Sequence, residues 1–73
     1  MKEKLMRAMK DGQIIEIVYE AKDGSISQRN IRVLSMKGDA VFAYCYLRGK
    51  RRLFHIDQLL AAYPAKLQQK RIG

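Results

Sequence analysis

The chain has 73 residues, enough for one small domain but too few for a second hydrophobic core. Its apolar fraction of 48% is typical of a globular protein, and it has neither an apolar run long enough to span a membrane nor a secretory signal pattern. Fifteen Lys and Arg against seven Asp and Glu give a net charge of +8, which favours anionic partners such as nucleic acids and nucleotides.

Residues 1–12 predict a short amphipathic helix. Leu5, Met6 and Met9 share one face at helical spacing, while the cations mostly face away. Gly12 suits the position just past the helix, because it takes a positive φ without strain. A helix this short is unstable alone in water, so we expect it to dock on the rest of the fold.

Two strands and a hairpin are predicted next. Residues 13–20 alternate, with Ile15, Ile17 and Tyr19 on one side, and residues 25–36 form the returning strand. The Asp-Gly pair at residues 23–24 is typical of a type I′ turn, which needs positive φ at both central residues. The apolar positions at residues 26 and 31 differ in parity, which predicts a bulge at residues 28–30.

The rest of the chain predicts two more strands and a short last element. A tight turn at residues 37–39 leads into residues 40–47, which are apolar on both faces and are therefore expected to be central or covered on both sides. A turn at residues 48–50 leads into a strand at residues 51–56. Residues 57–63 form one or two helical turns or a fifth strand, ending at Pro64. Residues 64–73 form a basic tail that is frayed or helical.

This order predicts a mainly β fold, a small SH3- or Sm-like antiparallel barrel of four to five strands with a short N-terminal helix. The whole chain, residues 1–73, is one domain, with the barrel at about residues 13–63. Cys45 is the only cysteine, so no internal disulfide can form. We expect Cys45 to be a small buried hydrophobe, and a lone thiol fits the reducing cytoplasm.

Enzyme constellations are nearly absent. The one histidine, His55, has no serine and acid at a spacing that suggests a triad, and the acids do not cluster at metal-ligand spacing. The five glycines are single, so no phosphate loop is present. We therefore expect no enzyme, no metal and no cofactor, and His55 is more often structural or exposed in such a context.

Cations gather in one region. Residues 28–53 hold a single acid and seven cations: Arg29, Arg32, Lys37, Arg48, Lys50, Arg51 and Arg52. The guanidinium groups of Arg48 and Arg52 can hold a phosphate through two hydrogen bonds. Tyr44 and Tyr46 share a strand face with Phe42 and offer rings for base stacking. The alternative is that this aromatic face is core and the cations only keep a hairpin soluble.

Residues 43–59, AYCYLRGKRRLFHIDQL, resemble the second half of a WYL domain. Arg52-Leu53-Phe54 matches an Arg-x-Phe step of that family, and Ile56-Asp57 matches its Leu-Asp step. Residues 15–33 resemble the family's first hairpin, with Arg29 and Ile31 as its Arg-x-Val/Ile pair. The resemblance covers roughly residues 5–63.

The sequence departs from the family pattern at several positions. Residues 39–41 are Asp-Ala-Val where the family has Trp-Tyr-Leu, and His55 and Gln58 stand where it has arginines. Val33 replaces a proline. Of the family's anion-binding positions, the match retains Arg29 and Arg52.

The resemblance implies an Sm- or SH3-like barrel that senses ligands. WYL domains usually lie beside a helix-turn-helix in bacterial transcription regulators, or beside other effector domains in phage-defence systems. This chain has one N-terminal helix and no helix-turn-helix, so we expect a stand-alone version. It is then a regulatory module that engages single-stranded nucleic acid or a nucleotide through a basic face. The predicted binding residues are Arg29, Arg48, Arg51, Arg52, Tyr44, Tyr46 and His55.

The second hypothesis is a module for protein interaction or homo-oligomerisation that has lost the ligand site. An exposed sheet edge can pair with another chain, and the departures from the family pattern favour this reading. A third hypothesis, docking of the N-terminal helix on an anionic membrane, is weaker because the helix is short and lacks large aromatics. We therefore expect no membrane partner.

Overall fold

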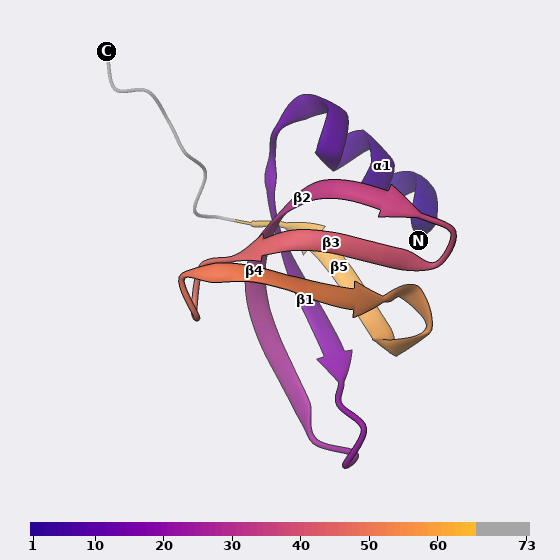
Figure 1. The fold of residues 1–73 in the computed structure, drawn as a ribbon, viewed down its shortest axis with the longest axis vertical. Coiled ribbons are helices and arrows are strands. Elements are labelled where there is room, and N and C mark those ends of the chain that lie inside the picture. The colour runs from indigo at the N-terminus through magenta and orange to yellow at the C-terminus, as the bar shows by residue number, and fades with distance from the viewer. Residues whose placement is uncertain (66–73) are drawn as a thin grey trace.

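The computed structural model describes residues 1–65, which form one helix and five strands in a single antiparallel sheet (Figure 1). The elements are α1 (Lys2–Asp11), β1 (Ile14–Glu20), β2 (Ile26–Lys37), β3 (Ala40–Cys45), β4 (Lys50–His55), the 3-10 helix η1 (Ile56–Gln58) and β5 (Leu59–Pro64). The mainly β fold with a short N-terminal helix is confirmed. The last segment contains both predicted alternatives, because a 3-10 turn precedes a fifth strand. The tail predicted beyond Ala65 lies outside the described residues.

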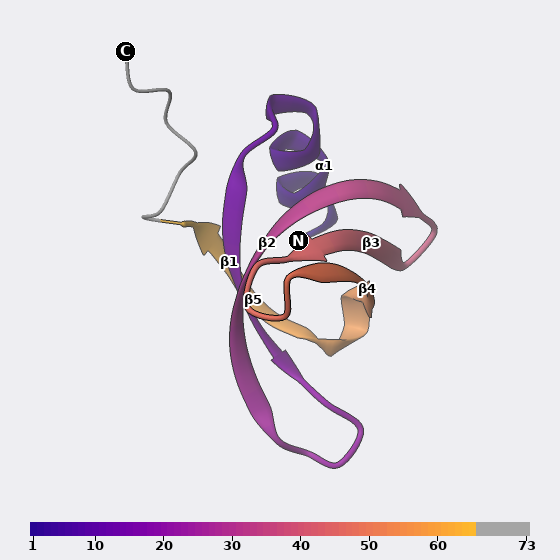
Figure 2. The same cartoon turned by 60° about the vertical axis from the view of Figure 1, so that its left-hand side comes forward.

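The sheet is strongly coiled but does not close into a full barrel (Figure 2). Its strand order is β4-β3-β2-β1-β5, and each neighbouring pair is antiparallel. Within residues 1–65, no ladder joins the two edge strands β4 and β5. The three residues of η1 connect these strands, and β5 makes its ladder with β1 instead. The predicted small antiparallel barrel is therefore an open, coiled sheet of five strands.

The predicted bulge in β2 is present, but at a different place. β1 and β2 pair without a break from residue 26 to residue 32, so residues 28–30 are regular. The register with β3 instead shifts between Val33 and Ser35, which leaves Leu34 as the extra residue. Ile26 causes no conflict of parity, because it is 61% exposed and takes no part in the core. A second irregularity lies between Val18 and Tyr19, opposite β5. Such bulges increase the local twist and help the sheet to coil.

The hairpin between β1 and β2 is confirmed, but its turn is not type I′. Gly24 has φ 90°, whereas no non-glycine residue within the described chain has a positive φ. Two backbone hydrogen bonds close the loop. The Gly24 N–H donates to the Ala21 carbonyl at 2.9 Å, and the Ala21 N–H donates to the Ser25 carbonyl at 2.8 Å. The Asp23 carboxylate accepts hydrogen bonds from the Ser25 N–H and hydroxyl group. Asp23 thus stabilises the loop through its side chain, which requires no positive φ at that residue.

The buried side chains define one face of the sheet, which we call the core face; the opposite one is the outer face. The core cluster comprises Leu5, Ala8, Ile15, Ile17, Tyr19, Ile31, Val33, Val41, Ala43, Cys45, Phe54, Leu59 and Ala62. Cys45 is fully buried, as predicted. β3 is central in the sheet, also as predicted, but it is covered on one face only. On its outer face Phe42 is 39% exposed and Tyr44 is half-buried, so the aromatic stripe is not core.

α1 docks on the sheet, next to β2, at the end opposite the β1–β2 hairpin loop (Figures 1 and 2). Leu5 and Ala8 lie one turn apart and are buried, and Met9 packs against the same cluster. Met6, which was expected on this face, is 44% exposed. Gly12 ends the helix with φ 66°, and its N–H donates to the Met9 carbonyl.

Candidate anion-binding site

Two arginines lie on the core face, at the rim of the coiled sheet. Ser27 of β2 pairs with Tyr19 of β1, and Arg29 lies two residues further along β2 on the same face. Arg29 is therefore diagonally across from Tyr19. Its guanidinium carbon is 5.7 Å from the centre of the Tyr19 ring. Arg52 precedes Phe54 on the same face of β4, and its guanidinium carbon is 5.7 Å from the centre of that ring. Each distance is within the range of a cation–π interaction.

The two aromatic rings touch and connect these arginines. Tyr19 and Phe54 meet edge to face, with ring centroids 5.3 Å apart and planes at 71°. We call Arg29, Tyr19, Phe54 and Arg52 the ring cluster. Both rings are almost fully buried, whereas both arginines are half-buried. The rings therefore pack against one face of each guanidinium group, and both arginine side chains stay partly exposed.

The charges of the ring cluster are not neutralised within the described part of the chain. Neither Arg29 nor Arg52 forms an ion pair with a residue of that part. Arg29 donates one hydrogen bond from Nη1 to the Gln28 carbonyl at 3.0 Å, but its buried Nε has no acceptor among the described residues. A buried donor without a partner costs free energy. Arg29 therefore keeps its positive charge and unused hydrogen-bonding capacity at the rim of the core face.

A pocket of about 340 Å³ opens beside the ring cluster. It is bounded by the end of β1 and the following loop on one side, and by β4 and η1 on the other. Its lining residues are Tyr19, Ala21, Lys22, Arg52, Leu53, His55 and Gln58. Among residues 1–65 no carboxylate lines it, and the charged side chains that do, Lys22 and Arg52, are cations. A volume above about 300 Å³ is in the range of small-ligand sites, which suits a group such as a nucleotide.

The other predicted aromatic residues lie on the outer face. The ladders place Arg32 opposite Tyr44, and Tyr44 opposite Arg51, so one cross-strand row carries a tyrosine between two arginines. Tyr46 meets Tyr44 edge to face, with ring centroids 5.0 Å apart. Arg48 is exposed in the turn between β3 and β4.

The structure thus distributes the seven predicted binding residues over two faces. Arg29 and Arg52 belong to the ring cluster, and His55 lines the pocket beside them. Tyr44, Tyr46 and Arg51 lie on the outer face, and Arg48 lies at the tip of the β3–β4 turn. Arg51 and Arg52 separate because successive residues of a strand point to opposite faces. Their neighbouring positions in the sequence do not make them one site.

Sequence reasoning missed both rings of the ring cluster, Tyr19 and Phe54, and the pocket residues Ala21, Lys22, Leu53 and Gln58. The alternation of residues 13–20 placed Tyr19 on one side with Ile15 and Ile17, but it did not reveal that the Tyr19 ring touches Phe54 or that each ring has an arginine over it. Lys22 lies in a hairpin loop, where a cation is unremarkable from sequence alone. The register of the β1–β2 hairpin places Arg29 diagonally across from Tyr19, so a register predicted from the turn could have revealed this one contact of the site.

Other chemistry finds no support in the described residues. Within residues 1–65 no group of three or more His, Cys, Asp or Glu side chains could hold a metal ion. Among the described residues, Asp23 is the carboxyl group whose pKa is clearly shifted, and it does not line the pocket. Hydrogen bonds from the Ser25 N–H and then its hydroxyl lower the pKa of Asp23 below its ordinary value of 3.8. The helices of the described chain are all too short and too polar to cross a membrane.

Comparison with known proteins supports the fold and no more. Neither a protein-family model nor a curated protein matches the sequence. A solved structure of proteasome accessory factor B/C (PafBC) of Arthrobacter aurescens matches with a TM-score of 0.81 and 18% sequence identity. The match covers 92% of this chain but 11% of the PafBC chain, so this protein corresponds to a small part of that one. At this identity the likeness establishes a shared fold.

Proposed function

We propose that the protein is a ligand-sensing regulatory module of the WYL type that binds single-stranded nucleic acid or a nucleotide, and that it is not an enzyme. The observation that carries the proposal is the ring cluster, in which two unneutralised arginines flank a pair of touching rings beside a pocket without acids. Arg29 and Arg52 are the two positions that the resemblance to WYL domains retained. The regulatory part of the proposal is in keeping with a fold shared with a protein named an accessory factor.

A nucleotide offers two groups that the site can recognise, its phosphate and its base. A phosphate in the pocket would accept hydrogen bonds from Arg52, which lines it, while Arg29, packed against the Tyr19 ring, adds positive charge beside it. Lys22 and His55 add cationic or hydrogen-bonding capacity at the pocket wall. A base can contact the exposed parts of the pocket, which also includes Leu53 and Gln58. We place this function in the cytoplasm of a bacterium, where the lone thiol of Cys45 stays reduced.

The experiment is a fluorescence anisotropy titration of a labelled single-stranded oligonucleotide of about 12 nucleotides, at low and at physiological salt. The decisive variants are Arg52→Gln and Arg51→Gln. They remove the same charge from adjacent residues, one on the core face and one on the outer face. Arg52→Gln should weaken binding about tenfold or more, the value of one charge-assisted hydrogen bond, while Arg51→Gln should weaken it less than about threefold.

Two results would count against the proposal. Equal effects of the two variants would reduce binding to diffuse charge, and a greater effect of Arg51→Gln would assign it to the outer face. Competition by a mononucleotide tells which form of the ligand is sufficient. If the mononucleotide displaces the oligonucleotide fully, the pocket alone provides the binding energy.

Self-association through β4 is a less favoured second function. The exposed edge strand begins with Lys50, Arg51 and Arg52, and antiparallel pairing of two copies would bring these like charges together. A concentration-dependent dimer that disappears in no arginine variant would favour this alternative.

A further inference from the structure

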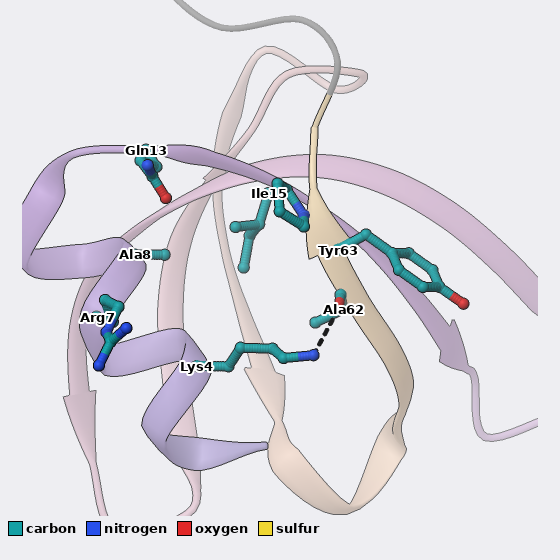
Figure 3. A pocket seen from close by; sticks show the side chains of 8 residues that line it. Lys4, Arg7, Ala8, Gln13, Ile15, Ala62 and Tyr63 are labelled. Carbon is teal, nitrogen blue, oxygen red and sulfur yellow. Dashed lines mark hydrogen bonds between the residues drawn. The ribbon is translucent and has the colours of Figure 1, made fainter.

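A second hollow lies between α1 and β5, and the proposed ligand site does not use it. Figure 3 shows this groove of about 160 Å³, with side chains of α1 on one wall and β5 on the other. Its floor is apolar, because Ala8, Ile15 and Ala62 line it and are each less than 10% exposed. The volume is below that of ordinary small-ligand sites. It suits a single apolar side chain that enters from outside.

The groove borders the free edge of β5. In the ladder with β1, the Ala65 N–H donates to the Ile14 carbonyl, so the backbone N–H and C=O of Ile14 point toward β5. Successive residues of a strand alternate in this direction, so the backbone groups of Ile17, three residues on, point away from β5. Ala62, opposite Ile17, therefore directs its N–H and C=O to the open edge of the sheet. The C=O accepts a hydrogen bond from Lys4 Nζ at 3.3 Å (Figure 3). Lys4 thus occupies the place that a backbone donor of a sixth strand would take.

The two edges of the sheet differ in protection. β4 carries three consecutive cations, which oppose pairing with a basic chain. β5 has the sequence LLAAYP and no charge, and its Leu60 and Tyr63 are each about half exposed. Of the side chains in the described part of the chain, Lys4 is the one with a hydrogen bond to this edge of β5, and Lys4 itself is exposed and able to move. This edge is the one that can accept a strand.

The charge of the groove selects the partner. Lys4 and Arg7 stand at its rim, and no carboxylate of the described residues lines it. Glu3 and Asp11 lie one turn from Arg7 on either side, but neither forms an ion pair with it within the described residues. A second copy of this chain would bring another charge of +8 to the same surface. Charge complementarity therefore favours an acidic partner over self-association.

We propose that the groove between α1 and β5 binds an extended acidic segment of a partner protein. One apolar side chain of the segment enters between Ala8, Ile15 and Ala62. A backbone N–H of the segment replaces Lys4 as the donor to the Ala62 carbonyl. Lys4, once released, and Arg7 then pair with carboxylates of the segment. This is strand addition with a single side-chain anchor, in which backbone bonds provide affinity and the groove provides specificity.

The test uses a fluorescein-labelled, C-terminally amidated peptide, Asp-Glu-Leu-Asp-Val, titrated with the full chain. Arg7→Glu should weaken binding about five- to tenfold, because it converts a carboxylate contact from attraction to repulsion. Lys10→Glu is the matched control, since it makes the same change one turn along α1 but does not line the groove. Its effect should be less than about twofold. A peptide with Ser in place of Leu should bind at least about tenfold more weakly.

The binding position is checked by amide chemical shifts in the complex. They should change at Ala8, Ala62 and Tyr63, and the Arg52→Gln variant should retain full peptide binding, which separates this proposal from the one above. Equal losses in Arg7→Glu and Lys10→Glu, or shift changes centred on Tyr19 and Arg52, would overturn it. So would a dimer that forms without peptide and is lost in Arg7→Glu, because the occupant would then be a second copy.

Discussion

The ring of Tyr19 meets the ring of Phe54 edge to face, although their strands are not neighbours in the sheet. β1 and β4 are separated by β3 and β2 in the strand order, yet the ring centroids are 5.3 Å apart. The contact exists because the sheet coils until its core face closes on itself. Each of the two rings also packs against one arginine of the candidate site, so the same pair of rings contributes to the core and positions the proposed binding residues.

Phe54→Ala should destabilise the fold by about 3–5 kcal/mol, because it removes the largest fully buried side chain and leaves a cavity beside Tyr19. For a domain this small, such a loss is comparable with the whole free energy of unfolding. Urea denaturation followed by circular dichroism measures it. Phe42→Ala is the control: that ring is 39% exposed on the outer face, and its loss should cost less than about 1.5 kcal/mol. Similar losses in both variants would contradict the assignment of the core face.

Arg29→Met should separate stability from binding. Removing the unpartnered Nε relieves a desolvation cost, while losing the contact with the Tyr19 ring removes a gain of similar size. We therefore expect the free energy of unfolding to stay within about 1 kcal/mol of the original. Oligonucleotide binding should fall about tenfold or more. If the variant bound the oligonucleotide as tightly as the original chain but was strongly destabilised, Arg29 would serve the fold and not a ligand.

Gly12 should tolerate Asn far better than Val. Its φ of 66° is a left-handed conformation that costs ordinary L-residues roughly 1–2 kcal/mol, whereas Asn adopts it more readily. A new Cβ would also lie 3.3 Å from Nη2 of Arg32, whose flexible end can move aside. Thermal unfolding of Gly12→Val and Gly12→Asn checks the order. Equal melting temperatures would mean that the end of α1 unwinds without consequence for the sheet.

Asp23→Asn should lower stability at neutral pH but not in acid. The Ser25 hydrogen bonds hold the pKa of Asp23 below its ordinary value of 3.8, so the ionised form is favoured by folding. That contribution is present above pH 3.8 and is lost as the pH falls through the lowered pKa. The difference between the original chain and the variant should therefore shrink as the pH falls from neutral to about 2.

Asp39→Asn is the control for this pH dependence, since Asp39 lies in another turn and its carboxylate accepts no hydrogen bond from the described residues. An NMR titration of the Asp23 carboxyl group gives the direction of its pKa independently. A titration at or above the ordinary value would contradict the hydrogen-bonded loop.

Local sequence patterns predicted most helices and strands correctly. They failed for features that depend on contacts with other strands or on side-chain hydrogen bonds. The alternation of Ile15, Ile17 and Tyr19 assigned the core face of β1 correctly, because a period of two is a property of the strand itself. The bulge was expected at residues 28–30 but occurs at Leu34, where β2 leaves one partner and bends along another. The turn at Asp23 was assigned to the wrong type, since its side-chain hydrogen bonds compete with the backbone preference of an Asp-Gly pair.

The candidate site divides in the same way. The sequence by itself determined that Arg52 and Phe54 share one face and that Arg51 takes the other, because adjacent strand residues alternate. It also determined the order of helix, strands and glycine turns, each of which depends on a few consecutive residues. Only the tertiary structure decided that the touching rings of Tyr19 and Phe54 lie between Arg29 and Arg52, that the sheet stays open between β4 and β5, and that α1 leaves a groove beside Ala62. These features depend on how far the whole sheet coils, and coiling is the sum of twist and bulges over strands that are distant in sequence.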